Sequence, residues 1–276
     1  MSENVKQKRV YLPRLSAVLN RKGVLDVDTV KGCTIGMASY PNGGCYGVCY
    51  ANRAAISRGF DFNSSVSRQI HDPDIIENTV KKHPASWFRI GCMGDPCHDW
   101  DLTLEVCKWL GKIKTPVIVT KHWKKLSTDH LIGLRECGAV VNTSTSPLDT
   151  ELERKTRLSE FERIRENGVR SVLRIVSCGF ANTERGQEFS EIQRQLFEHT
   201  PNIDNPLRIN RTDSRVVKNS GQGIFEIPGA NFGFINTCKR NDLGGGSFVS
   251  VFNKKSYIGK CTDCPDQCGI DMEATQ

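Results

Sequence analysis

Three cysteines near the N-terminal end have a spacing that suits metal chemistry. Cys33, Cys45 and Cys49 are separated by eleven and three residues, in a segment rich in glycine and aromatic residues. Three thiolates that converge in space can hold an iron–sulfur cluster or a metal ion while one coordination position stays open. A catalytic metal site needs an open coordination position, because a fully ligated metal cannot bind a substrate or a cofactor. The alternative is three unrelated buried cysteines.

A second group of cysteines lies at the C-terminal end. Cys261, Cys264 and Cys268 follow the pattern C-x2-C-x3-C, and Cys238 precedes them. Four neighbouring thiolates form a closed site that suits either zinc or a second iron–sulfur cluster. The surrounding segment has too little apolar sequence for a core of its own, so we expect a bound metal to stabilise it.

The composition is that of an ordinary globular protein, with 38% apolar and 25% charged residues among 276. No stretch reaches the roughly 20 apolar residues of a membrane helix, and the first residues lack the apolar core of a signal peptide. We therefore expect a cytoplasmic protein with no membrane partner. In that reducing compartment, clustered cysteines ligate metals more often than they form disulfides.

The charge favours a polyanionic partner. The formal net charge is +7, and basic clusters occupy residues 121–125 and 208–215, with Trp100 and Trp123 as nearby aromatic residues. Basic and aromatic side chains together are typical of surfaces that bind a nucleic acid or a nucleotide. A solvated basic surface without such a role is the alternative.

The elements that must position these residues alternate regularly. Polar side chains such as His98 and His122 follow predicted strands. They would lie at the carboxyl edge of the sheet, where parallel α/β folds have their active sites. The alternative is that they only pack in loops. Alternation of apolar strands with amphipathic helices predicts βαβ units around a parallel sheet. Strands are predicted at residues 87–92, 116–120, 139–143, 170–177 and 206–210, and helices at 71–83, 101–111, 128–137, 150–167 and 184–199, with a helix start at 50–58.

Five or six such units are too few for an eight-stranded barrel, which usually needs about 250 residues. We predict an α/β fold, a partial (β/α)6 TIM-like barrel over residues 1–217, although an open doubly wound sheet would also fit. Residues 218–276 would form a small cysteine-rich extension that binds a metal or a cluster.

The order of these features resembles the radical S-adenosylmethionine (SAM) superfamily, over roughly residues 27–215. Residues 45–51 (CYGVCYA) look like the last two cluster cysteines with their aromatic neighbour. Residues 93–96 (MGDP) are similar to the family's glycine-rich turn, whose backbone meets the SAM amino group. Residues 142–146 (NTSTS) resemble the strand end that contacts the SAM ribose or carboxylate, and residues 173–177 (LRIVS) resemble the strand near the adenine.

The resemblance implies a set of cofactors and ligands. A [4Fe–4S] cluster, reduced by an electron donor such as flavodoxin or ferredoxin, would cleave SAM to methionine and a 5′-deoxyadenosyl radical, which abstracts a substrate hydrogen. For each arginine among the SAM ligands named in the next sentence, the alternative role is a surface ion pair. The cluster would be held by Cys33, Cys45 and Cys49, and SAM by Met93, Gly94, Asp95, Pro96, Asn142, Ser144, Arg154 and Arg174. The residue that acts on the substrate is not identified.

The cysteine spacing departs from the family's usual C-x3-C-x2-C pattern, because the first interval here is eleven residues. Cluster geometry allows a longer loop, since the thiolates need only converge in space. If Cys33 is not a ligand, Cys92 or Cys97 beside the 93–96 turn is the best substitute. Members of the superfamily resemble this chain in carrying an auxiliary cluster in a C-terminal extension, which favours [4Fe–4S] over zinc at Cys238, Cys261, Cys264 and Cys268.

These observations predict a radical SAM enzyme that modifies or repairs a nucleic acid or a nucleotide, including an enzyme of phage origin. One alternative is a radical SAM enzyme acting on a peptide or a small amino-acid-like substrate. The other is a non-catalytic, zinc-stabilised nucleic-acid-binding protein, in which both cysteine groups are structural.

Overall fold

The computed structural model describes most of the chain between residues 13 and 205 and a C-terminal segment. Cys45, Cys238, the basic cluster at residues 208–215 and the predicted strand at 206–210 lie outside the described residues. The described ranges are residues 13–20, 22–39, 49–177, 179–180, 184–205, 217–219, 224–226, 233–235, 247–248, 257–258 and 260–272.

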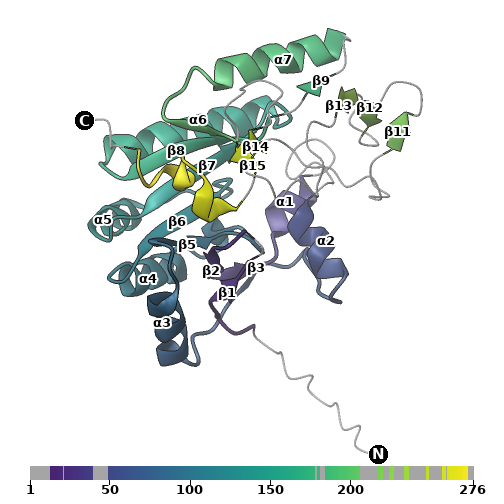
Figure 1. The fold of residues 1–276 in the computed structure, drawn as a ribbon. Coiled ribbons are helices and arrows are strands. Elements are labelled where there is room, and N and C mark those ends of the chain that lie inside the picture. The colour runs from purple at the N-terminus through teal and green to yellow at the C-terminus, as the bar shows by residue number, and fades with distance from the viewer. Residues whose placement is uncertain are drawn as a thin grey trace, which may run out of the picture.

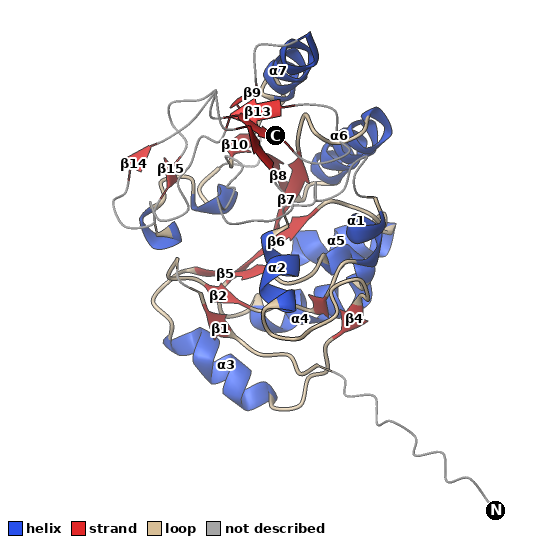
Figure 2. Cartoon of the chain, turned by 90° about the vertical axis from the view of Figure 1, so that its right-hand side faces the viewer, coloured by secondary structure: helices blue, strands red, loops and turns tan. Residues whose placement is uncertain are grey.

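A seven-stranded, mostly parallel sheet forms the centre of the fold (Figures 1 and 2). The first strand pairs antiparallel with the second, and the other neighbouring pairs are parallel. Figure 2 shows the strands following one another across the molecule. Their order is β1 (Val18–Leu19), β2 (Leu25–Asp26), β5 (Trp87–Ile90), β6 (Thr115–Thr120), β7 (Val140–Thr145), β8 (Arg170–Ile175) and β10 (Asn202–Asp204).

Helices connect successive parallel strands, as the alternation predicts. Two of them begin with capping boxes, in which Ser127 and Thr150 exchange hydrogen bonds with the third helical residue, so the sequence itself sets where they start. The connecting helices are α3 (Pro73–Lys82), α4 (Trp100–Leu110), α5 (Thr128–Glu136), α6 (Glu151–Glu166) and α7 (Glu184–Leu196). Each overlaps a helix predicted from the sequence, and α2 (Tyr50–Ile56) confirms the predicted helix start.

The two faces of the sheet are buried by different partners. Phe88, Ile90 and Ile118 belong to the core that also contains residues of α3, α4 and α5. Trp87, Val117 and the neighbouring strand residues on the other face pack instead around Cys268. Each fully buried large side chain contributes roughly 1.5–3 kcal/mol through the hydrophobic effect. In Figure 1 the C-terminal segment (yellow) accordingly lies against the strands.

The α/β class is confirmed, with six parallel strands linked through helices. The sheet is open: β1 and β10 are its edges, and no pairing among the described strands joins them into a closed barrel. Smaller sheets flank it. They pair β3 (Val30–Lys31) with β4 (Val66–Ser67), β14 (Ser247–Phe248) with β15 (Tyr257–Ile258), and β11 (Val217–Asn219), β12 (Ile224–Glu226), β13 (Gly233–Ile235) and β9 (Gly179–Phe180) in that order.

The predicted C-terminal extension touches the main fold at two places. Strand β13 pairs with β9, and the short 3-10 turns η2 (Cys261–Asp263) and η3 (Gln267–Gly269) pack on the central sheet. The boundary at residue 217 stays a prediction. Within the part of the chain that the structure covers, every helix is too short or too polar to cross a bilayer.

Candidate metal and cofactor site

The turn after β5 is shaped by a buried carboxylate. Asp28 is 6% exposed and accepts hydrogen bonds from the backbone amides of Gly91 (2.9 Å), Cys92 (2.7 Å) and Met93 (2.9 Å). Burial raises the pKa of Asp28, and the amide donors oppose that shift. Gly91 has φ +106°, which residues with a side chain rarely adopt. Asp28 and Gly91 thus fix the direction in which the 93–96 turn leaves the sheet.

Close backbone contact then brings the first cysteine to this turn. Gly32 and Gly94 form a parallel β-bridge, and the Gly32 amide donates to the Met93 carbonyl at 3.0 Å. A Cβ atom on Gly94 would lie 2.4 Å from the Val30 carbonyl oxygen, which no side chain permits. The helix α1 (Thr34–Ala38) starts directly after Cys33. The glycines therefore set Cys33 beside the turn that carries Met93 and Asp95.

Two of the three predicted cluster cysteines share one apolar cluster. Cys33 and Cys49 lie there with Met93, and the other members are Met37, Ala51, Ala55, Phe62 and Trp123. Burial raises the pKa of the Cys33 thiol to about 12, nearby Asp95 and Cys49 add to the shift, and the Trp123 indole opposes it. Cys33 is therefore a neutral thiol in the free protein, and a bound metal would replace its proton.

The complete ligand set extends beyond what the structure covers. Cys45 lies outside the described residues, and among the residues that are described no three His, Cys, Asp or Glu side chains converge as a metal site. The site therefore supplies two thiols from described positions. The third would come from Cys45, four residues before Cys49 in the sequence.

The two substitute cysteines lie elsewhere. Cys97 is fully buried and packs in the core between the sheet and the helices, apart from the Cys33 cluster. Cys92 is 8% exposed, and its nearest charged groups are Arg89, Asp28 and Asp26. Burial raises the pKa of both thiols. The convergence with Cys49 thus involves Cys33 and neither substitute.

Asp95 fastens the turn to the end of the next strand. Its carboxylate accepts from the Thr120 hydroxyl at 2.6 Å, the Lys121 amide at 2.8 Å and the Cys97 amide at 3.1 Å. Pro96 follows as the first residue of the 3-10 helix η1 (Pro96–His98). Residues 93–96 are thus held rigidly at the carboxyl edge of the parallel strands, where α/β folds bind ligands.

An ion-pair network that sequence patterns did not indicate supports this edge. Asp149 is buried and pairs with Lys121 at 3.1 Å and with the buried guanidinium of Arg157. The Arg157 guanidinium also lies 4.7 Å from the Trp123 ring centroid, and Trp123 belongs to the Cys33 cluster. Arg154, predicted to bind SAM, directs one NH group at the carbonyls of the loop before α6. The sequence pattern does not predict that Arg157 is buried, because an arginine at this position of a helix is expected on the polar, solvent-exposed face.

The remaining predicted SAM ligands lie under the C-terminal turn. Asn142 donates to the Cys268 carbonyl at 2.9 Å, and Arg174 lies 3.7 Å from the Cys268 sulfur and 3.1 Å from the Asn205 side-chain oxygen. Ser144 pairs in register with Arg174 and is buried. The structure therefore places residues 93–96 beside Cys33, and Asn142 and Arg174 beside Cys268, while Arg154 contacts the loop before α6.

The C-terminal cysteines occupy a compact pair of turns. Cys268 is 8% exposed, with φ +58°, and faces the sheet. Burial raises the pKa of the Cys264 thiol, and neighbouring Asp266 and Cys268 contribute. Cys261, Cys264 and Cys268 do not converge as a three-ligand site within the described residues, and Cys238 lies outside them. A zinc ion or second cluster here stays a prediction.

His122 follows β6 in an unusual environment. It is 3% exposed with φ +51°, and its Nε2 lies 3.0 Å from the Thr143 hydroxyl. Its Nδ1 has no hydrogen-bond partner among the described residues. Burial lowers its pKa to about 4, so the imidazole is neutral at pH 7.

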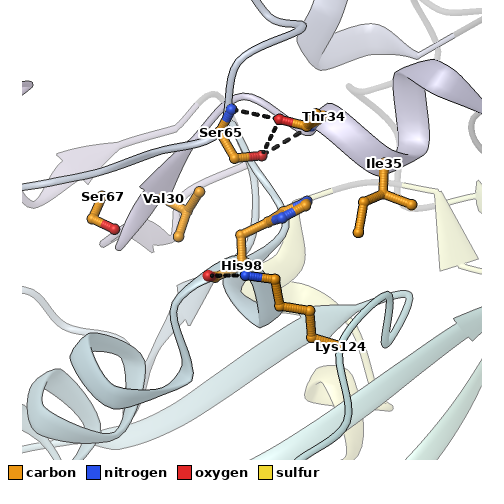
Figure 3. A pocket seen from close by; sticks show the side chains of 7 residues that line it. All are labelled: Val30, Thr34, Ile35, Ser65, Ser67, His98 and Lys124. Atoms are coloured by element: carbon orange, nitrogen blue, oxygen red, sulfur yellow. Dashed lines mark hydrogen bonds between the residues drawn. The ribbon is translucent and has the colours of Figure 1, made fainter.

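A cavity of about 330 Å³ opens beside the Cys33 segment (Figure 3). Val30 and Ile35 supply apolar walls, and the polar walls come from Thr34, Ser65, Ser67, His98 and Lys124. Figure 3 shows the His98 ring projecting among these side chains. Part of the lining thus follows Cys33 directly, through Thr34 and Ile35, and His98 follows the 93–96 turn.

Comparison with known proteins yields one structural neighbour and no relative by sequence. No family model matches the chain, and no curated protein matches it. Among solved structures, the chain is similar to a mutant of spore photoproduct lyase, with 16% identity and a TM-score of 0.49. The match covers 75% of this chain and spans 63% of the length of that protein.

Proposed function

We propose that this chain is a radical SAM enzyme in which Cys33, Cys45 and Cys49 hold a [4Fe–4S] cluster, and that its substrate is a nucleic acid or a nucleotide. The observation that carries the proposal is the convergence of Cys33, Cys49 and Met93 in one cluster. That cluster lies at the carboxyl edge of a parallel sheet, held there by Asp28 and by the Gly32–Gly94 bridge.

The residues fit such a cofactor. Two thiols already share an apolar environment, and Cys45 is four residues before Cys49, which is within reach of a common centre. Three thiolates leave one iron free for the amino-acid part of SAM. When bound, the cluster would supply the electron that cleaves SAM.

The protein itself would orient SAM and keep water out. Residues 93–96 present a rigid turn, because Asp28 holds its first part and Asp95 ties its end to β6. Ala51, Ala55 and Phe62 are buried around the thiols and shield Cys33 from solvent, whereas Cys49 is partly exposed. Shielding and a fixed geometry limit side reactions of a radical.

The proposal includes the C-terminal cysteines and the partners. Cys238, Cys261, Cys264 and Cys268 would hold an auxiliary [4Fe–4S] cluster or a zinc ion, and flavodoxin or ferredoxin would supply electrons. The net charge of +7 and the lysines at residues 121–125, next to the site, support a polyanionic substrate.

The test is anaerobic purification followed by iron, sulfide and zinc analysis, a visible spectrum and a SAM-cleavage assay. About eight irons per chain would indicate two clusters, and about four irons with one zinc would indicate a structural tail. Zinc alone would contradict the enzyme and indicate a nucleic-acid-binding protein.

Paired variants identify the ligands. Cys33→Ala and Cys49→Ala should each abolish SAM cleavage and remove about four irons, whereas Cys92→Ala, an equally conservative change at a buried cysteine, should retain both. Retention of cleavage by Cys49→Ala would contradict the cluster assignment. Loss of SAM cleavage and iron in Cys92→Ala, with both retained in Cys33→Ala, would identify Cys92 as the first cluster ligand.

A further inference from the structure

The cavity beside Cys33 has one wall of paired hydroxyls and one wall of nitrogen groups. The Thr34 hydroxyl and the Ser65 hydroxyl lie 3.1 Å apart, and each also accepts from a backbone amide of the other residue. The Ser67 hydroxyl donates to Asp99. The hydroxyl protons of Thr34 and Ser67 are therefore already donated, and the Asp99 carboxylate accepts from Ser67.

The opposite wall carries groups with unused donor capacity. His98 Nε2 is a buried atom with no hydrogen-bond partner among the described residues. The Lys124 ammonium donates to the His98 carbonyl at 3.0 Å, which uses one of its three N–H groups. A buried polar atom without a partner is costly, and a ligand that accepts a hydrogen bond would remove that cost.

These groups specify the chemistry of the ligand. A cation is disfavoured, because the described residues that line the cavity include an ammonium and no carboxylate. An anion that accepts several hydrogen bonds suits Lys124 and the Nε2–H tautomer of His98. At about 330 Å³ the cavity falls at the small end of the roughly 300–1,000 Å³ range of ligand sites, large enough for a phosphorylated sugar but not for a folded nucleic acid.

We propose that this cavity binds a phosphate group of the substrate, with Lys124 and His98 as its ligands. The inference rests on the proposed function and names how the substrate is recognised there. Thr34 and Ile35 follow Cys33 directly, and His98 follows the 93–96 turn, so a phosphate in the cavity holds the adjoining sugar next to the radical-generating site. The phosphate belongs either to a mononucleotide or to a nucleic-acid backbone.

The experiment measures binding to the anaerobically purified full chain by titration calorimetry. The probes are inorganic phosphate, a nucleoside monophosphate, the matching nucleoside and a short single-stranded oligonucleotide. Lys124→Met and His98→Ala should each weaken binding of the nucleoside monophosphate about tenfold, the effect of losing one charge-assisted or buried hydrogen bond. His98→Gln retains an N–H donor and should restore part of the loss.

Lys112→Met is the matched control, because Lys112 is exposed and precedes β6 at the opposite end of that strand. It removes the same charge and should leave monophosphate binding unchanged. Preference for the monophosphate over the oligonucleotide would assign a mononucleotide substrate, and the reverse would assign a nucleic acid. Equal binding of nucleoside and monophosphate, or equal losses in Lys124→Met and Lys112→Met, would overturn the proposal.

The outcome is separable from that of the proposed function. Phosphate binding that persists in Cys49→Ala, together with an iron-free wild-type protein, would retain the anion site and reject the radical enzyme. An iron-loaded protein that cleaves SAM but shows no phosphate-dependent binding would retain the enzyme and reject the anion site.

Discussion

The two cysteine regions of this chain lie at different parts of the central sheet and are positioned by different kinds of contact. Cys33 and Cys49 lie at the edge of the sheet, in a small apolar cluster next to a rigid turn and a polar cavity. Cys268 lies on the face of the sheet, among Trp87, Val140 and Val172. At the edge the backbone is shaped around the thiols, whereas on the face the cysteine serves as part of a core.

The difference shows what positions each region. The edge site depends on backbone groups, namely the amides bound by Asp28 and the Gly32–Gly94 contact, which hold the 93–96 turn beside Cys33. The C-terminal turn depends on side chains of the sheet, because Asn142 and Arg174 reach out to it. Catalytic sites gain from the first kind of support, which orients ligands before anything binds.

The largest effect should come from adding one methyl group to the edge site. Gly94→Ala would place a Cβ atom 2.4 Å from the Val30 carbonyl oxygen and 2.8 Å from the Gly32 oxygen. We expect a loss of about 3 kcal/mol of unfolding free energy, measured by denaturant titration, together with loss of iron from the proposed cluster. Gly59→Ala is the control: no atom of the described residues lies within 4 Å of its Cβ position, so only its φ of +70° is strained, at about 1 kcal/mol. Equal losses in the two variants would refute the close contact.

Lowering the pH should reduce the free energy of unfolding, because His122 becomes protonated on unfolding. Its pKa is about 4 in the folded protein, against an ordinary value of 6.5. Between these values the unfolded chain binds more protons, so stability is complete above pH 6.5 and falls as the pH drops towards 4, by roughly 3 kcal/mol at most. The charges around the ring are those of Asp95, Glu160, Arg157 and Arg163.

The measurement is the unfolding free energy between pH 7 and pH 4. His122→Asn tolerates the left-handed backbone and does not titrate, so its curve should be flatter than that of the wild-type chain over this window. Parallel curves for the two proteins would show that His122 is not the group responsible.

A smaller effect is expected from the carboxylate beneath the turn. Asp28→Asn retains an acceptor for the Gly91 and Cys92 amides but turns an NH2 group towards the Met93 amide. We expect a loss of about 2 kcal/mol and a lower iron content, because two donors then face each other in a buried site. Asp61→Asn, at an exposed carboxylate that also accepts from a backbone amide, should cost clearly less stability than Asp28→Asn and leave the iron content unchanged.

Much of this architecture could be predicted from local sequence. The capping boxes at Ser127 and Thr150 and the alternation of apolar runs determine where helices and strands occur. The turn at residues 93–96 and its position after a strand were also evident, because glycine and proline mark such turns. These features depend on neighbours in the sequence.

The parts that were missed depend on partners far apart in the sequence. Asp28 lies 63 residues before Gly91, and Arg157 lies 36 residues after Lys121, whose carbonyl it binds. No spacing rule connects such pairs. The edge strand β10 shows a related limit, since no strand is predicted at Asn202–Asp204, where tertiary pairing with β8 decides the register.

Asn142 offers the most specific test of the comparison between the edge site and the C-terminal turn, because two interpretations assign it different contacts. Resemblance to radical SAM enzymes predicts contact with SAM, whereas the structure shows its amide donating to the Cys268 carbonyl. If the second role dominates, Asn142→Ala loses about 1 kcal/mol, and hydrogen exchange at residues 260–272 accelerates while SAM affinity and the iron of the proposed cluster are retained. If the first dominates, SAM affinity falls and exchange in the C-terminal turn is unchanged. A combined loss would mean that the C-terminal turn helps to hold SAM, so that the face and the edge form one site.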